Sequence, residues 1–210
     1  FAQRVAWLQL GAEQEYGAEV GALASAAQLE KMTEHVDDAV GKGARVVAGG
    51  KARPEIGPFF YEPTVLAEIT PEMDVYREET FGPLVSIYPY TSVDDAVDAV
   101  NDTEYGLNSS VYCGDTSKGR KIGERLMSGT VNINDGYSSG WASIDAPMGG
   151  MKQSGVGRRH GRDGLLKYTE SQTIAVRSAL AAKLQDPGND GAGYAKRFTA
   201  ILRAAKHLPR

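Results

Sequence analysis

The sequence predicts an α/β fold built on a parallel sheet. Segments with helical periodicity alternate with short β-prone runs, which is the order expected of βαβ units. Apolar residues make up 41% of the 210 residues and charged residues 24%, as in ordinary globular proteins. The single cysteine, Cys113, excludes an internal disulfide and favours a reducing compartment, so we expect a cytoplasmic protein.

The first part of the chain is expected to hold two helices and three strands. Phe1 to Leu10 is apolar on one side and stops at Gly11. Ser25 followed by Gln28 is a capping-box signature, and Gly43 should close the helix behind it. Pro63 restricts the second strand to a sheet edge or a strand start. The expected strands are Arg45 to Ala48, Tyr61 to Leu66 and Leu84 to Tyr88.

The next part repeats the alternation of helix and strand. Ser92 should cap a short helix, with Asp94 and Asp95 at its positive end. The glycine- and serine-rich stretch from Asp135 to Trp141 is expected to be a loop. Between the helix capped by Ser92 and this loop we expect a strand through Ser110 to Tyr112, a helix from about Thr116 to Met127 and a strand over Thr130 to Asn134.

The C-terminal part has weaker patterns. Thr169 to Arg177 alternates weakly, and Asp186 to Gly193 is interpreted as a linker. A basic amphipathic helix should follow, and its short apolar face favours docking on protein over docking on a membrane. That face consists of Tyr194, Phe198, Ile201, Leu202 and Ala205.

Charge is spread unevenly along the chain. Residues 1–146 carry 11 Lys and Arg against 23 Asp and Glu, whereas residues 147–210 carry 12 against 4. A basic region can bind nucleic acid, or it can attract an acidic part of the same assembly. No interleaving of aromatic and basic residues supports base stacking, so nucleic acid is not an expected partner. No run is long enough to span a membrane.

Cys113 and the histidines are interpreted as structural or solvated. Cys113 follows a β-prone run, and the nearby carboxylate of Asp115 disfavours a reactive thiolate. No histidine lies near Cys113 in the sequence. His35, His160 and His207 have no metal-ligand spacing.

The stretch Tyr76-Arg77-Glu78-Glu79-Thr80-Phe81-Gly82-Pro83 contains the first motif that could carry a function, Glu78 to Pro83. Glu79 and Phe81 share one face if the chain there is extended. A carboxylate can accept hydrogen bonds from both hydroxyls of a ribose, and a neighbouring ring can pack on the sugar or base. The alternative is an acidic surface loop that leads into a buried strand, and the stretch alone favours it.

The second motif runs from Ala146 to Arg158 and is rich in glycine. Its glycines could cradle a phosphate, but the strand and helix of a dinucleotide fingerprint are absent. The simpler interpretation is that they permit tight turns and close backbone approach. Basic residues also occur here in a run, which should form a solvated or interface surface. They are Lys152, Arg158, Arg159 and Arg162.

Together the two motifs resemble those of the aldehyde dehydrogenase superfamily, E-E-x-F-G-P and P-F-G-G-x-K-x-S-G-x-G-R. The similarity runs from about Gly11 to Arg177, and the details at 145–151 and 157–161 most resemble actinobacterial-type succinate-semialdehyde dehydrogenases. Further matching blocks are Gly43 to Gly50, Tyr105-Gly106-Leu107 and Gly164 to Glu170.

The resemblance assigns roles to six residues. Glu79 would hold the nicotinamide ribose with Phe81 beside it, and Leu107 would lie near the nicotinamide. Gln28 and Lys31 would contact the adenosine side of NAD or NADP. Met148 replaces the phenylalanine that is usual at this position and would line the aldehyde tunnel, at the acyl pocket. The residue that separates NAD from NADP belongs to the family's upstream half.

The resemblance also implies an architecture. Residues 1–146 would be the C-terminal part of an incomplete parallel-sheet catalytic domain. Residues 147–178 would be the motif loop, a short helix and an oligomerisation strand, and residues 179–210 a linker and helical tail. The strand, Thr173 to Arg177, would extend a neighbouring subunit's sheet in a homodimer or homotetramer.

Family members attack the aldehyde with a cysteine upstream of the region matched by Phe1 to Leu10. Their general base, oxyanion-hole asparagine and Rossmann domain are also upstream. Because the chain starts at Phe1 within an expected helix, we interpret it as part of a longer or processed protein. We expect it to be inactive alone. The alternative is a non-catalytic module for assembly and cofactor contact.

Overall fold

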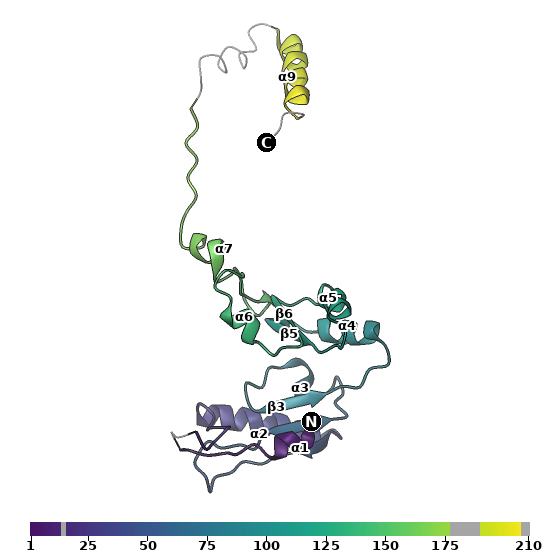
Figure 1. The fold of residues 1–210 in the computed structure, drawn as a ribbon, viewed down its shortest axis with the longest axis vertical. Coiled ribbons are helices and arrows are strands. Elements are labelled where there is room, and N and C mark those ends of the chain that lie inside the picture. The colour runs from purple at the N-terminus through teal and green to yellow at the C-terminus, as the bar shows by residue number, and fades with distance from the viewer. Residues whose placement is uncertain (14–15, 177–189, 207–210) are drawn as a thin grey trace. The chain divides into compact units, whose positions relative to one another are not determined.

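The computed structural model describes residues 1–13, 16–176 and 190–206 (Figure 1). The chain divides into two compact units, Phe1–Lys167 and Tyr168–Arg210. Residues 147–167 therefore group with the first unit. The domain boundaries expected after residues 146 and 178 stay predictions.

The first sheet has the order β1-β2-β3 and is mixed. Its strands are Arg45–Ala48, Thr64–Ala67 and Leu84–Ile87. The β1–β2 pair is antiparallel and the β2–β3 pair is parallel, which makes β2 the central strand. Pro63 immediately precedes β2, so the strand-start interpretation is confirmed and the edge interpretation is wrong. A proline there removes no hydrogen bond from the ladder.

Helix α2 (Ala26–Gly41) supplies the core against this sheet. Met32 and Val36 pack with Tyr61, and Ala39 packs with Leu66. The hydroxyl of Ser25 accepts a hydrogen bond from the Gln28 backbone N–H at 3.2 Å, which confirms the N-cap. The expected capping box is only half formed, because the Gln28 side chain bonds elsewhere. Gly43 has a φ of 104° and follows the helix end as expected.

A parallel βαβ unit follows in the same compact unit. Strands β5 (Asn108–Val111) and β6 (Thr130–Ile133) pair in parallel, and α5 (Thr116–Gly123) connects them. Helix α4 (Val93–Asn101) precedes them and begins with a complete capping box between Ser92 and Asp95. The short strands β4 (Tyr105–Gly106) and β7 (Met151–Lys152) pair antiparallel. The fold is thus α/β with parallel portions.

Several element boundaries differ from the sequence expectation. Helix α1 covers only Ala2–Ala6, and α5 ends at Gly123 instead of Met127. The expected loop after Asp135 contains a short helix, α6 (Ser138–Ala142). The Asp135 carboxylate accepts hydrogen bonds from the Ser139 N–H and the Ser138 hydroxyl, which stabilises that turn. Two more short helices are α3 (Asp74–Arg77) and α7 (Gly161–Leu166).

The second unit contains α9 (Gly191–Ala205). The rings of Tyr194 and Phe198, both on this helix, stack on each other with centroids 5.6 Å apart. The helix begins inside the expected linker, because Asp190 caps it by accepting from the Gly193 N–H. Residues 186–189, Arg177 and His207 lie outside the described residues. Among the helices that the structure describes, none has the length and apolarity needed to cross a membrane.

Candidate functional site

The loop Glu78–Pro83 joins α3 to β3 and carries the first motif. Phe81 has a φ of 55°, in the left-handed region. Glu79 and Phe81 are expected to share one face if the chain there is extended. The left-handed conformation of Phe81 interrupts the extended chain. Phe81 as a whole residue is 77% exposed. A side chain at Gly82 would place its Cβ 2.8 Å from the Met32 sulfur, so glycine permits the close contact with α2.

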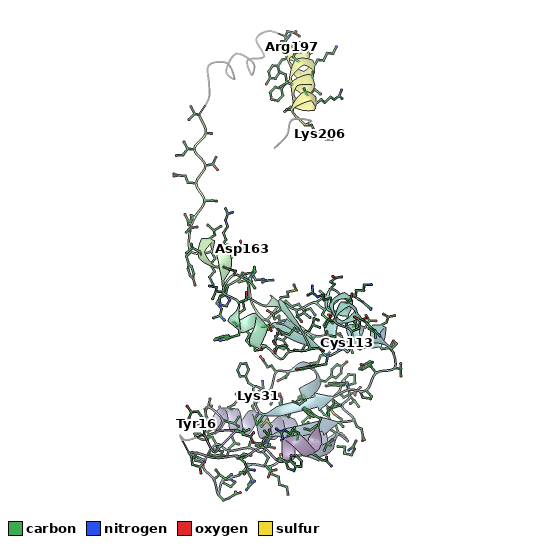
Figure 2. The ribbon with its side chains drawn as sticks, in the orientation of Figure 1. Tyr16, Lys31, Cys113, Asp163, Arg197 and Lys206 are labelled. Atoms are coloured by element: carbon green, nitrogen blue, oxygen red, sulfur yellow. The ribbon has the colours of Figure 1, made fainter. Side chains whose placement is uncertain are left out.

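Helix α2 holds this loop through polar contacts. Gln28 Nε2 donates to the Thr80 carbonyl at 2.5 Å. The Thr80 hydroxyl lies 2.9 Å from His35 Nδ1, and the tautomer of the ring decides which is the donor. Lys31 Nζ and His35 Nε2 lie 3.6 and 3.5 Å from the Glu78 carboxylate. Figure 2 labels Lys31 on this helix.

Glu79 and Phe81 line an open depression of about 450 Å³. Gly82 and Pro83 complete one side of it, and residues 20–23 form the other. The structure therefore brings together two of the predicted site residues. Gln28 and Lys31 lie on the adjoining helix, where their polar atoms contact Thr80 and Glu78. Their expected contact with adenosine stays a prediction.

The second motif holds the segment that carries Leu107. Lys152 Nζ donates to the carbonyls of Asn101 at 2.7 Å and Thr103 at 2.8 Å, at the carboxyl end of α4. The Ser154 hydroxyl accepts from the Gly106 N–H at 2.9 Å. Lys152 is therefore not simply part of a solvated basic surface, because its ammonium group satisfies helix-end carbonyls. Leu107 itself is 48% exposed.

Met148 lies at the start of the second motif and is 9% exposed. Its backbone pairs with that of Arg159 through two hydrogen bonds, at 2.8 and 2.6 Å. The Tyr137 hydroxyl donates to its sulfur at 3.3 Å. A Cβ at Gly149 would lie 2.6 Å from the Gly157 carbonyl, so the expected close backbone approach is confirmed. A role for Met148 toward substrate stays a prediction.

The carboxyl end of α4 binds cations from two distant segments, Arg77 before the first motif and Lys152 in the second. Arg77, just before the first motif, donates to the Asp102 carbonyl and carboxylate, each at 2.9 Å. The Arg77 guanidinium lowers the pKa of the Asp102 carboxyl below its usual value. Lys152 of the second motif binds the carbonyls on either side of Asp102. Sequence reasoning missed this junction, because Lys152 lies 51 positions from Asn101 and 49 positions from Thr103.

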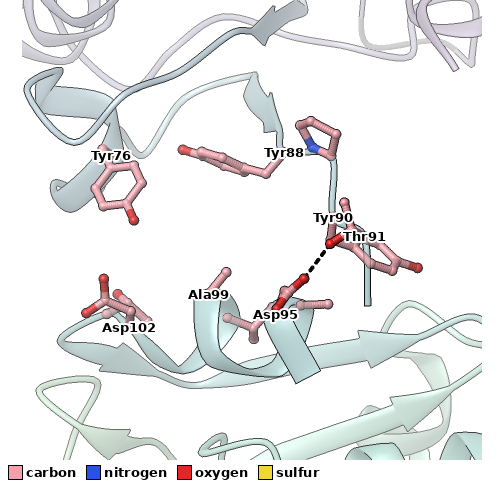
Figure 3. A pocket seen from close by; sticks show the side chains of 11 residues that line it. Tyr76, Tyr88, Tyr90, Thr91, Asp95, Ala99 and Asp102 are labelled. Carbon is pink, nitrogen blue, oxygen red and sulfur yellow. Dashed lines mark hydrogen bonds between the residues drawn. The ribbon is translucent and has the colours of Figure 1, made fainter. Parts of the chain in front are cut away.

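A tyrosine-rich cavity of about 620 Å³ lies beside this junction (Figure 3). Tyr76 and Tyr88 face Ala99 and Asp102 of the α4 region across it. The two tyrosine rings make an edge contact with centroids 5.9 Å apart. None of the six predicted site residues lines this cavity, so it is not the site that the motifs indicate.

Cys113 lies two residues after β5 and is half-buried (Figure 2). Its backbone N–H and carbonyl both bond the Asn134 side chain, at 2.7 and 2.8 Å. The Asp115 carboxylate accepts from N–H groups at the start of α5. The contacts of Cys113 thus fit the structural interpretation. Within the described ranges, no cluster of His, Cys, Asp or Glu could hold a metal ion.

The other histidines differ in their surroundings. His35 is 4% exposed and bonded to Thr80, so it is buried and not solvated. His160 precedes α7 with a φ of 65°. Its Nδ1 is buried and has no hydrogen-bond partner among the described residues.

Comparison with known proteins decides the family. A family model described as "Aldehyde dehydrogenase family" matches residues 1–174. The chain belongs to the aldehyde dehydrogenase family. A Mycobacterium tuberculosis protein named "Putative succinate-semialdehyde dehydrogenase [NADP(+)] 2" is 53% identical over all 210 residues. A similarly named Mycolicibacterium smegmatis protein is 51% identical. The chain spans about 40% of the length of these curated aldehyde dehydrogenases.

Solved aldehyde dehydrogenase structures agree with the fold. A succinate-semialdehyde dehydrogenase from Burkholderia pseudomallei superposes with a TM-score of 0.72 and 40% identity. The match covers 80% of this chain and 34% of that structure. A betaine aldehyde dehydrogenase from Staphylococcus aureus, solved in complex with NAD+, gives a TM-score of 0.74 and 34% identity over 80% and 33% of the two chains.

Proposed function

We propose that this chain forms the part of an NAD(P)-dependent aldehyde dehydrogenase that holds the nicotinamide ribose and contacts a neighbouring subunit. The observation that carries the proposal is the loop Glu78–Pro83, which α2 holds while Glu79 and Phe81 line an open depression. The enzyme would oxidise an aldehyde to its carboxylic acid in the cytoplasm. The names of the mycobacterial relatives favour succinic semialdehyde as substrate and NADP+ as cofactor.

The residues of the depression fit a ribose and its base. The Glu79 side chain is exposed and can accept hydrogen bonds from two vicinal hydroxyls. The exposed Phe81 ring can cover an apolar face of the sugar or the nicotinamide. Leu107 would add an apolar contact near the nicotinamide. Gln28 and Lys31 would contact the adenosine side, and Met148 the aldehyde.

A bound nicotinamide cofactor would supply the hydride acceptor. The chain's own contribution is orientation: Glu79 would fix one ribose, while the α2 contacts hold the loop that carries it. The attacking thiolate would come from the family's upstream half, because the described hydrogen bonds of Cys113 are made by its backbone N–H and carbonyl, with no base bonded to its thiol.

We expect the 210-residue chain alone to reduce neither NAD+ nor NADP+ in the presence of aldehydes. The measurement is absorbance of reduced nucleotide with succinic semialdehyde and several other aldehydes. A chimaera provides the positive arm: the upstream part of the Mycolicibacterium smegmatis relative followed by this chain in place of its matching 40%. That chimaera should turn over.

Two results would contradict the proposal. Turnover by the chain alone that disappears in Cys113→Ser would make Cys113 the nucleophile. A folded chimaera that binds neither nucleotide would instead favour a non-catalytic assembly module.

A further inference from the structure

Thr80 is buried and lies between Glu79 and Phe81 in the chain, and α2 contacts its backbone carbonyl and its side-chain hydroxyl. Gln28 Nε2 donates a hydrogen bond to the Thr80 carbonyl at 2.5 Å, and His35 Nδ1 is hydrogen-bonded to the Thr80 hydroxyl at 2.9 Å. The exposed fractions are 8% for Thr80 and 4% for His35. A buried hydroxyl and a buried imidazole each need such a partner, so loss of either leaves the other unsatisfied.

The contact lies next to the strained position of the loop. Phe81 keeps its φ of 55° although it is not glycine. Such a conformation persists only where the surrounding structure holds it. Thr80 is fixed before Phe81, and Gly82 lies against Met32 after it. Helix α2 therefore clamps the loop on both sides of Phe81.

We propose that His35 is a positioning residue for the cofactor site. It acts through the Thr80 hydroxyl, which lies between Glu79 and Phe81 in the chain and fixes the directions of both. His35 Nε2 also faces the Glu78 carboxylate at 3.5 Å, on the other side of Glu79. The imidazole thus contacts both residues that flank Glu79, one on each side. This inference rests on the function proposed above.

Four substitutions in the chimaera test the contact between His35 and Thr80. Thr80→Val keeps the shape of the side chain and removes the hydroxyl, whereas Thr80→Ser keeps the hydroxyl. His35→Phe removes the ring nitrogens, whereas His35→Asn offers an amide group near the position of Nδ1. Thr33→Val is a matched control, because the Thr33 hydroxyl bonds only the Leu29 carbonyl within the same helix in the described contacts.

We expect Thr80→Val and His35→Phe to lower kcat by on the order of 10- to 100-fold, because orientation losses fall on the chemical step. The KM for the nucleotide should change much less. The primary isotope effect with aldehyde deuterated at C1 should increase as hydride transfer becomes slower. Thr80→Ser and His35→Asn should restore most of kcat, and Thr33→Val should resemble wild type.

Each other outcome has a definite meaning. An unchanged kcat and isotope effect in folded Thr80→Val would overturn the role of His35. Equal losses in all four variants, with lower thermal stability and nucleotide binding, would reduce the pair to a folding contact and overturn it as well. Glu79→Gln in the same chimaera separates a failure of the proposed function from a failure of this inference. Full activity of Glu79→Gln would refute the proposed function and this inference with it. A slow Glu79→Gln beside a normal Thr80→Val would refute the inference alone.

Discussion

Single residues of the two motifs have contacts that no local sequence pattern shows. His35 and Thr80 are 45 positions apart, and Gln28 and Thr80 are 52 apart. Sequence patterns report capping and periodicity over a few residues, so they paired Gln28 with Ser25 and missed Thr80. Glu79 and Phe81 could be selected from the sequence because their side chains match the chemistry of a ribose. The left-handed backbone conformation of Phe81 could not be predicted from the sequence.

Lys152 gives a test at the level of one residue. Lys152→Met keeps the apolar stem and removes two charge-assisted hydrogen bonds to α4 carbonyls. We expect the free energy of unfolding to fall by about 1.5–3 kcal/mol, the usual range for hydrogen bonds to a charged group. Urea unfolding of the chain, with the m-value compared, measures the change.

The control for Lys152 is Lys121→Met on the exposed surface of α5. It should change the free energy of unfolding by less than about 0.5 kcal/mol. Equal effects of the two substitutions would show that the contact at the end of α4 contributes nothing particular.

The elements were predictable where their signals are local. The Ser92 cap of α4, the parallel β5–α5–β6 unit and the strand start after Pro63 all follow from short sequence patterns. Helix α6 was missed because its glycine and serine residues have weak helix propensity. The signal was present in Asp135, whose carboxylate can accept from the following N–H and hydroxyl groups.

The contribution of Asp135 should depend on pH. Hydrogen bonds from Ser139 and Ser138 hold the pKa of its carboxyl well below the ordinary value of 3.8. Because the pKa is lower in the folded state, the stabilisation is complete above about pH 4 and is lost as the pH falls toward the folded pKa. Asp135→Asn should therefore be less stable than wild type at neutral pH, with a difference that shrinks below about pH 4.

Trp141 lies in α6 and can report this change. Urea unfolding would be followed by its fluorescence in a Trp7→Phe background, from neutral to acid pH, for both forms. A stability difference that stays constant or grows with acid would contradict the assigned role of Asp135.

At the level of the whole molecule, the run before Arg177 lacks a partner strand in the described structure. Figure 1 shows an extended trace there, and Ile174 and Val176 are 82% and 88% exposed. Exposed β-prone backbone can add to the sheet edge of another chain. We therefore predict a dimer or larger assembly that uses residues 173–177.

Ala175→Pro would remove a backbone donor from that strand and should weaken the assembly. Ala175→Val is the control, because it keeps the donor and favours β structure. Size-exclusion chromatography with light scattering gives the molar mass of each form. A monomeric wild type, or Ala175→Pro that assembles as tightly as wild type, would place the interface elsewhere.

The sequence could indicate the family because several motifs occur in the right order, and the fold agrees. It could not indicate how Arg77 and Lys152 meet at residues 101–103, since they lie 25 and 51 positions from the residues that they contact there. The roles of Leu107 and Met148 depend on groups outside this chain, so they stay predictions.

The most direct test of the central claim is the rate of hydride transfer in Glu79→Gln, measured by stopped-flow in the chimaera. The carboxylate orients one ribose, whereas affinity is distributed over the whole dinucleotide. We predict a hydride step slowed by on the order of 10²-fold with a small change in nucleotide affinity. Glu30→Gln, the same change on the exposed side of α2, should leave the step unchanged. A hydride step in Glu79→Gln as fast as in wild type would contradict the claim.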